Sequence, residues 1–190
     1  MSGKKRRDSI GQLNNQGFSL LELLVVMAII VIVSTITAVG LNVLAEGNAK
    51  KANKTMYSKI SELRTTTMSK SGEWYMVISC QDNTYTLETH HVADGEDNIK
   101  DTSKFSASRI SLNYYNGDSS TGYDLKNNSL KIQFNKNDGS CKSVTINDTE
   151  KFITENLDAP QFGKIVASVS RNNTYESKLW YKTGRVTTQN

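Results

Sequence analysis

Glu22 is the residue whose type and position most clearly require a chemical explanation. It lies in an apolar stretch, with Phe18, Leu20 and Leu21 before it and an uncharged run, residues 23–45, after it. A carboxylate within a bilayer costs on the order of 3 kcal/mol, so such an acid usually has a partner. The residues alone leave two interpretations open: Glu22 lies at the membrane interface, or it pairs with a cation at the same depth.

The uncharged run is long enough for a membrane-spanning helix. At about 1.5 Å per residue it reaches about 34 Å, and the hydrocarbon core of a bilayer is roughly 30 Å thick. The basic cluster Lys4–Arg7 precedes it, which predicts a cytoplasmic N-terminus and an extracytoplasmic remainder. A secretory signal peptide would need a shorter apolar core and a better small-residue site than Ala38-Val39-Gly40. A plain signal anchor fits the length but does not explain Glu22.

The segment NNQGFSLLELLVVMAIIVIV, residues 14–33, resembles the class III signal of type IV pilins and type II secretion pseudopilins. In that family a basic leader ends in Gly, and a prepilin peptidase cleaves after it. The new N-terminal residue, commonly Phe, is N-methylated, and the fifth mature residue is Glu. The resemblance therefore implies cleavage between Gly17 and Phe18, methylation of Phe18 and an assembly role for Glu22.

Physical chemistry supports this role for Glu22. Cleavage would create an α-amino group on Phe18, one helical turn from Glu22. In a bundle of parallel subunits, the carboxylate of one subunit can reach the amine of its neighbour. Two charges that are each costly in a low dielectric become tolerable as a pair. The helix dipole also favours an anion near a helix N-terminus.

Past Ala45 the predicted helix becomes amphipathic. One stripe recurs at steps of three and four residues: Ala49, Ala52, Met56, Ile60, Leu63 and Thr67. This spacing predicts one buried helix face. The lysines on the other faces favour a solvated surface over DNA contact. Ser71-Gly72 predicts the end of the helix.

From residue 73 onward the pattern indicates β-structure. EWYMVISC and TYTLETHHV flank Gln81–Asn83, and NSLKIQF and CKSVTI flank Asn135–Gly139, which predicts two hairpins. We expect about six strands in all, and Asn147–Glu150 could cap a short helix. The predicted fold class is α+β, a long N-terminal helix packed on an antiparallel β-sheet, as in pilins.

This interpretation predicts that the chain has four segments. The chain divides into a leader at 1–17, the transmembrane half of the helix at 18–45, its amphipathic half at 46–71 and an extracellular β-rich domain at 72–190.

Cys80 and Cys141 are the only cysteines, and both follow the apolar run. An oxidising exterior permits a disulfide, and each cysteine lies at the end of a predicted strand. We predict that they pair, while two free buried thiols stay open as the alternative.

Metal binding and catalysis receive little support from the residue patterns. Residues 93–104 predict an acidic loop, but Asp94, Glu96, Asp97 and Asp101 lack the spacing of a calcium loop. In a strand, His90 and His91 would face opposite sides, which argues against joint zinc binding. No phosphate-binding loop or catalytic set is recognisable in the sequence. We therefore expect no enzyme activity, no cofactor and no metal.

The predicted function is that of a structural subunit of a type IV pilus, competence pilus or type II secretion pseudopilus. Major pilins often have Pro at mature position 22, where this chain has Val39, and a disulfide loop near the C-terminus, which the residues after Cys141 lack. These departures favour a minor subunit, and the ending LWYKTGRVTT resembles H-type minor pseudopilins. The alternative is a membrane-anchored extracellular binding module that does not assemble.

The resemblance also implies the partners and the location. The partners are other pilins, the prepilin peptidase, an inner-membrane assembly platform and, before assembly, membrane lipid. The chain would be a single-pass cell-membrane protein that moves to a filament or the cell surface. DNA binding has no support, because residues 1–17 hold most of the net charge of +4.

Overall fold

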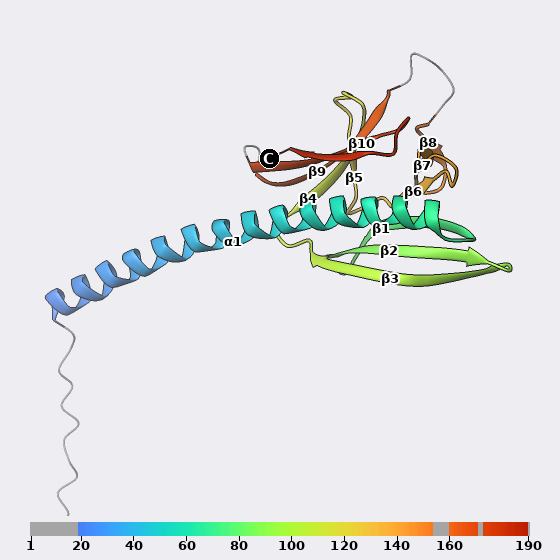
Figure 1. Ribbon diagram of the computed structural model, residues 1–190. Coiled ribbons are helices and arrows are strands. Elements are labelled where there is room, and N and C mark those ends of the chain that lie inside the picture. Colours follow the sequence, from blue (N-terminus) through green and yellow to red (C-terminus); the bar gives the residue numbers. More distant parts are fainter. Residues whose placement is uncertain (1–18, 154–159, 171–172, 190) are drawn as a thin grey trace, which may run out of the picture. The chain divides into compact units, whose positions relative to one another are not determined.

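The computed structural model describes residues 19–153, 160–170 and 173–189, except the side chains of residues 36–42 and 170. Within the described residues, the single helix α1 (Leu20–Ser69) has 50 residues and precedes every strand (Figure 1). The chain divides into two compact units, Met1–Gly40 and Leu41–Asn190, and α1 contributes to both. We call the second unit the head.

In the head, α1 buries the stripe that its sequence spacing predicts. Ala49, Ala52, Met56 and Ile60 are fully buried, and Leu63 and Thr67 are nearly so. The prediction of an amphipathic helix is therefore confirmed. The same stripe also buries Asn53, a polar residue that the spacing alone would not place in a core.

The first sheet, sheet A, has six strands in the order β3-β2-β1-β6-β7-β8. Its members are β1 (Glu73–Gln81), β2 (Thr84–Ala93), β3 (Glu96–Ser106), β6 (Leu130–Phe134), β7 (Cys141–Ile146) and β8 (Glu150–Lys151). The two hairpins predicted from the sequence, β1–β2 and β6–β7, are both present and antiparallel. Asp82 and Asn83 between β1 and β2 have φ of 48° and 56°, the backbone of a tight two-residue hairpin turn.

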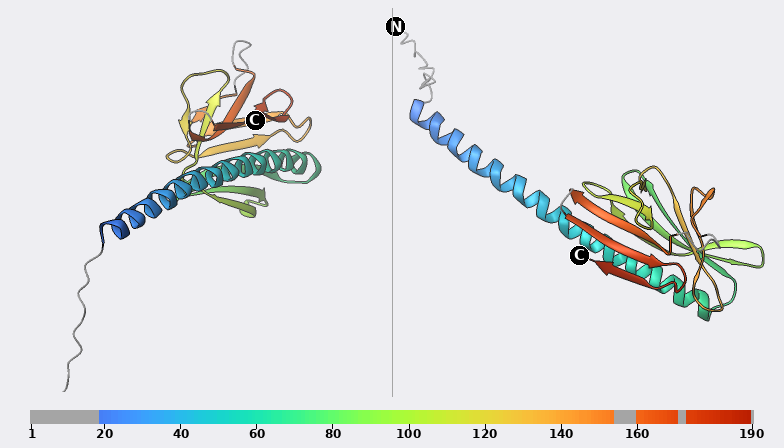
Figure 2. Two further views of the ribbon diagram at one scale, coloured as in Figure 1. Left: turned by 90° about the vertical axis from the view of Figure 1, so that its left-hand side faces the viewer. Right: turned by 90° about the horizontal axis from the view of Figure 1, so that it is seen from above.

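The second sheet, sheet B, has five strands in the order β11-β10-β9-β4-β5. Its members are β4 (Ser111–Asn116), β5 (Tyr123–Asp124), β9 (Phe162–Ser170), β10 (Asn173–Trp180) and β11 (Val186–Gln189). The β2–β3 hairpin and strands β9 and β10 lie on opposite sides of α1 in the head (Figure 1 and Figure 2). The predicted α+β class, with a helix packed on antiparallel sheet, is confirmed.

Polar contacts join α1 to both sheets. Ser177 Oγ on β10 donates to Asn53 Oδ1 at 2.6 Å, a buried bond that satisfies both groups. On the other side, Lys59 forms an ion pair with Asp101 of β3 at 2.9 Å. At the end of the helix, Arg64 Nε donates to the carbonyl of Gly139 at 3.0 Å. These bonds fix the position of the helix along the strands.

The two sheets are also joined directly. The backbone N–H of Leu112 donates to the Tyr85 hydroxyl at 3.0 Å, and that of Cys141 donates to the Tyr181 carbonyl at 2.8 Å. The hydroxyls of Tyr114 and Tyr181 are hydrogen-bonded to each other in the core, and burial raises the pKa of Tyr114. The core of the head therefore combines apolar packing with a few satisfied polar links.

Three sequence-based expectations about the strands are wrong. The head has eleven strands in two sheets within the described residues, not about six in one sheet. Residues 93–104 are not a loop, because most of them form β3 along β2. Asn147 and Asp148 do not cap a helix; with φ of 50° and 57° they turn the chain from β7 into β8. In β3, long-range pairing with β2 overrides weak local β-propensity.

Candidate functional site

The beginning of α1 is built by a Ser–Glu capping sequence. Ser19 Oγ accepts a hydrogen bond from the backbone N–H of Glu22 at 3.1 Å, and the Ser19 carbonyl accepts one from the N–H of Leu23 at 3.1 Å. Serine at the N-cap with glutamate three residues later is a typical helix start. Glu22 therefore lies in the first turn, where the helix dipole also favours its charge.

The turns that follow expose apolar side chains all around the helix. The residues concerned, each at least 45% exposed, are Leu20, Leu21, Leu23, Leu24, Val25, Val26, Met27, Ile29, Ile30, Val31, Ile32 and Val33. Soluble monomers rarely expose a continuous apolar surface of this kind, and such surfaces usually mark contact with protein or membrane. This part of α1 therefore requires an apolar environment.

The first hydroxyl groups after the apolar turns are satisfied by the helix itself. Ser34 Oγ donates to the Ile30 carbonyl at 2.6 Å, and Thr35 Oγ1 donates to the Val31 carbonyl at 2.8 Å. Hydroxyls bound to carbonyls four residues earlier need no water or outside partner. These two residues therefore do not prevent an apolar environment around the helix.

The sequence predicts a membrane-spanning segment at residues 23–45. Over the part of the chain that the structure describes, no helix combines the length and the apolar character needed to cross a membrane. The described residues therefore do not confirm this span.

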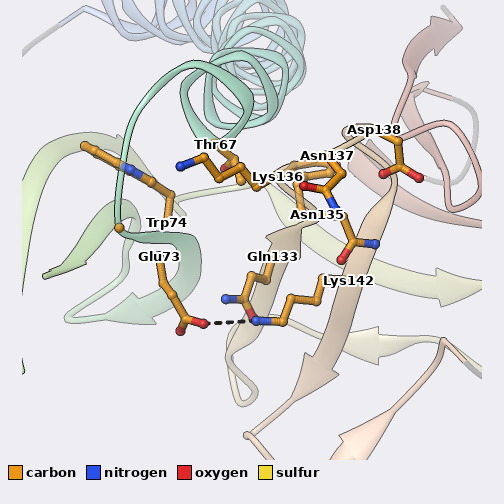
Figure 3. Close-up of a pocket in the computed structure, with 11 residues that line it drawn as sticks. Thr67, Glu73, Trp74, Gln133, Asn135, Lys136, Asn137, Asp138 and Lys142 are labelled. Atoms are coloured by element: carbon orange, nitrogen blue, oxygen red, sulfur yellow. Dashed lines mark hydrogen bonds and ion pairs between the residues drawn. The ribbon is translucent and has the colours of Figure 1, made fainter.

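An open cleft of about 470 Å³ lies where α1 ends and where β6 turns into β7. Figure 3 shows Trp74 and Glu73 on one side of it and Asn135 and Asp138 on the other. Glu73 forms an ion pair with Lys142 at 3.1 Å across the cleft. Hydrogen bonds from the backbone N–H and the hydroxyl of Ser140 lower the pKa of Asp138.

The groups in this cleft suit polar contact rather than nucleophilic chemistry. Trp74 is only 7% exposed, and its ring stacks on His91 at a centroid distance of 4.1 Å. The lining has no cysteine or histidine, and the Thr67 hydroxyl is already bound to the Leu63 carbonyl at 2.9 Å. The described lining thus offers no hydroxyl or thiol nucleophile with an adjacent base, and the Lys142 amine is held in its ion pair with Glu73.

A second polar cluster fixes β3 to its neighbours. The Tyr75 hydroxyl and His90 Nδ1 both contact the carboxylate of Asp97, and the rings of Tyr75 and His90 stack at 4.6 Å. The hydrogen bond from Tyr75 is the main cause that lowers the pKa of Asp97, and desolvation is the main cause that raises that of Tyr75 to about 12. Among the described residues, no group of three or more acidic, histidine or cysteine side chains could hold a metal ion.

Comparison with known families identifies the N-terminal region. Residues 12–38 match the family model of the prokaryotic N-terminal methylation motif, the prepilin-type signal of type IV pilins and pseudopilins. The chain carries a prepilin-type signal. This signal is typical of structural subunits that a prepilin peptidase processes and that assemble with other pilins. A search of curated proteins and a search of solved structures found no match to the chain.

The prepilin-type signal includes all three residues that the sequence assigned to processing and assembly. Gly17 and Phe18 lie outside the described residues, so cleavage and methylation there stay predictions. Glu22 is described, and within the described part of the chain its carboxylate has no hydrogen-bond or ion-pair partner. A carboxylate without a partner among the described residues of its own chain is consistent with a partner on another subunit.

The predicted disulfide is absent, and both cysteines are free thiols. Cys141 pairs with Phe134, whose neighbour Gln133 pairs with Tyr75 at the beginning of β1. Cys80 lies near the other end of β1, six residues past the level of Cys141. At about 3.3 Å per residue the two are roughly 20 Å apart along the strands, far beyond the reach of a disulfide.

Sequence reasoning also missed residues that turn out to be structurally important. The Ser19 cap had a readable signal, because Ser-x-x-Glu before an apolar run marks a helix start. The buried Asn53–Ser177 bond had none, because the two residues are far apart in sequence. The cleft beside Trp74 likewise depends on three separate segments meeting.

Proposed function

We propose that the chain is a minor pilin or pseudopilin, a subunit of a type IV pilus, competence pilus or type II secretion pseudopilus. The match of residues 12–38 to the prokaryotic N-terminal methylation motif carries this proposal. The apolar surface at the start of α1 supports it, because that surface needs a partner. The minor assignment rests on Val39 and on the lack of a disulfide loop after Cys141.

In this proposal, processing prepares the helix for assembly. A prepilin peptidase cleaves between Gly17 and Phe18 on the cytoplasmic side and leaves the basic leader behind. The apolar start of α1 holds the chain in the cell membrane, and the head lies outside. The subunit then leaves the membrane through an assembly platform and enters a filament at the cell surface.

The apolar residues alone cannot explain why the helix leaves lipid for protein. Lipid tails are as apolar as leucine, so moving the helix between the two gains little from the hydrophobic effect. Glu22 differs, because its charge is costly in lipid and is compensated beside a neighbouring amine. We propose that pairing of Glu22 with the methylated amine of Phe18 on the next subunit selects assembly and sets its register.

Mass spectrometry of the mature protein tests the processing step. We expect the chain to begin at Phe18 with a methylated amine. An intact Met1, or a start near Gly40, would show that the chain is not processed as a prepilin.

Replacement of Glu22 tests the assembly step. Glu22→Leu should still be cleaved, and its head should unfold at the wild-type temperature, because the carboxylate has no partner among the described residues of its own chain. Its amount in sheared filaments should fall in a strain that lacks the wild-type copy. Normal incorporation would refute the pairing mechanism. A processed chain that never enters filaments would favour the non-assembling binding module.

A further inference from the structure

The outer face of sheet B gathers cations and aromatic rings at one end. Lys164 on β9 and Lys178 on β10 are directly opposite each other. Lys164 lies over the Tyr115 ring at 5.5 Å, and Lys178 lies over the Phe162 ring at 4.4 Å. Like charges opposite each other in adjacent strands are unfavourable. The Glu176 carboxylate lies 4.0 Å from the Lys164 ammonium group and 3.7 Å from that of Lys178, so one carboxylate forms ion pairs with both lysines.

Beside these lysines lies a hollow of about 280 Å³ with an exposed aromatic wall. It is lined by Gln161, Trp180, Lys182, Thr183 and Arg185. Trp180 is 38% exposed, and its ring packs on Phe162 at a centroid distance of 5.3 Å. Lys182 and Arg185 add two more exposed cations. We call this end of sheet B the basic hollow; its aromatic wall and cations are complementary to an apolar side chain surrounded by negative charge.

The β2–β3 hairpin of the same head has the complementary features. Residues 84–106 hold five carboxylates and two lysines, and β3 is an edge strand of sheet A. Three of the acids, Glu88, Asp97 and Asp101, contact groups of their own head, which leaves Asp94 and Glu96 for an outside partner. Ile99 on β3 is 54% exposed. Outside α1, only Ile99 and Trp180 are exposed large apolar side chains among the described residues of the head. Ile99 shares the hairpin with the exposed acids Asp94 and Glu96 near its tip.

We propose that the basic hollow of one subunit receives Ile99 and the acidic β2–β3 hairpin of a second copy of this chain. An apolar side chain seated against an aromatic wall, with charged groups at the rim, matches the usual anatomy of a specific protein contact. The rim charges give orientation more than affinity.

The placement of the two surfaces makes this contact suitable for a filament. The hairpin and strands β9 and β10 lie on opposite sides of α1 (Figure 1 and Figure 2). Contact between two different surfaces of identical subunits is head-to-tail, and it propagates unless the ring closes. This inference rests on the proposed filament function and names the surfaces through which the heads meet.

Cross-linking of the full chain in cells tests the contact. One tagged copy would carry Ile99→Cys and a differently tagged copy Thr183→Cys, with the native cysteines alone as the background control. We expect a mixed-tag dimer after mild oxidation, with a yield that falls at high salt because exposed charges are screened. A yield no higher than the background would overturn the proposal.

Changing the charges on the two cysteine-bearing copies then distinguishes a specific contact from cross-linking by random collision. Lys182→Glu with Arg185→Glu should lower the cross-linking yield about tenfold, because each substitution turns an attraction into a repulsion. Adding Asp94→Asn and Glu96→Lys to the partner copy should restore it. Lys126→Glu with Lys151→Glu changes the charge equally at exposed sites outside the hollow and the cleft, and it should have no effect.

The outcomes distinguish the contact from the proposed function. Loss of cross-linking without rescue by the exchanged charges would overturn the contact, whether or not the chain enters filaments. Absence of the wild-type chain from sheared filaments would instead refute the filament function. Cross-linking only to a different protein at Thr183 would show that a second copy is not the occupant.

Discussion

Two isoleucines of α1 allow the separate roles of the helix to be tested with one substitution. Ile60 is fully buried in the head, whereas Ile30 is 53% exposed in the apolar part of the same helix. Each Ile→Ala change removes three carbon atoms and improves helix propensity by the same few tenths of a kcal/mol. Any difference between the two variants therefore reports their surroundings.

The expected cost at Ile60 follows from its burial. Each buried methylene contributes about 0.8 kcal/mol, so three carbons account for roughly 2.4 kcal/mol. The cavity left among Met56, Leu63 and the sheets raises the loss of unfolding free energy to about 3–4 kcal/mol. For a domain of this size the unfolding temperature should fall by about 6–16 °C. Ile30→Ala should leave it unchanged, because the head does not bury Ile30.

Intrinsic tryptophan fluorescence of the full chain in detergent, followed during heating, measures these unfolding temperatures. Both tryptophans, Trp74 and Trp180, lie in the head, so the signal reports the unfolding of that unit alone. Ile30→Ala should instead reduce incorporation into sheared filaments. Two results would refute the proposal that Ile60 packs the head while Ile30 contacts other subunits. One is an Ile60→Ala variant that unfolds at the wild-type temperature. The other is an Ile30→Ala variant that lowers the unfolding temperature as much as Ile60→Ala does.

Non-reducing mass mapping should find both thiols free, and Cys80 should react before the buried Cys141, whose pKa is raised to about 12 by desolvation. Gly184→Ala should destabilise the head more than Gly95→Ala: both glycines have positive φ, but only at Gly184 would the new Cβ lie 1.8 Å from a carbonyl oxygen, as comparative thermal unfolding would show. The folded-state pKa of Asp97 is lowered, so its carboxylate should stabilise the head above its unfolded pKa and lose that effect as the pH falls. Asp97→Asn should therefore lower the melting temperature near neutral pH, and this difference should shrink in acid.

The sequence by itself determined the features that depend on local pattern. Glycine, phenylalanine and glutamate in the right order after a basic leader defined the prepilin-type signal, and one short segment is enough for that recognition. The stripe from Ala49 to Thr67 predicted the buried face of α1, because a helix places residues three and four apart on one side. The β1–β2 and β6–β7 hairpins followed from alternating strands and turn residues close together in the chain.

Only the tertiary structure decided which distant strands pair and in what register. That pairing divides the strands into two sheets and places Cys80 and Cys141 at opposite ends of sheet A. It also gives the acidic residues after Ala93 a strand to pair with, although their own β-propensity is low. Register depends on contacts summed over whole strands, and no single residue pattern encodes that sum. For the same reason the Asn53–Ser177 bond, which joins α1 to β10 across more than a hundred residues, has no signature in the sequence.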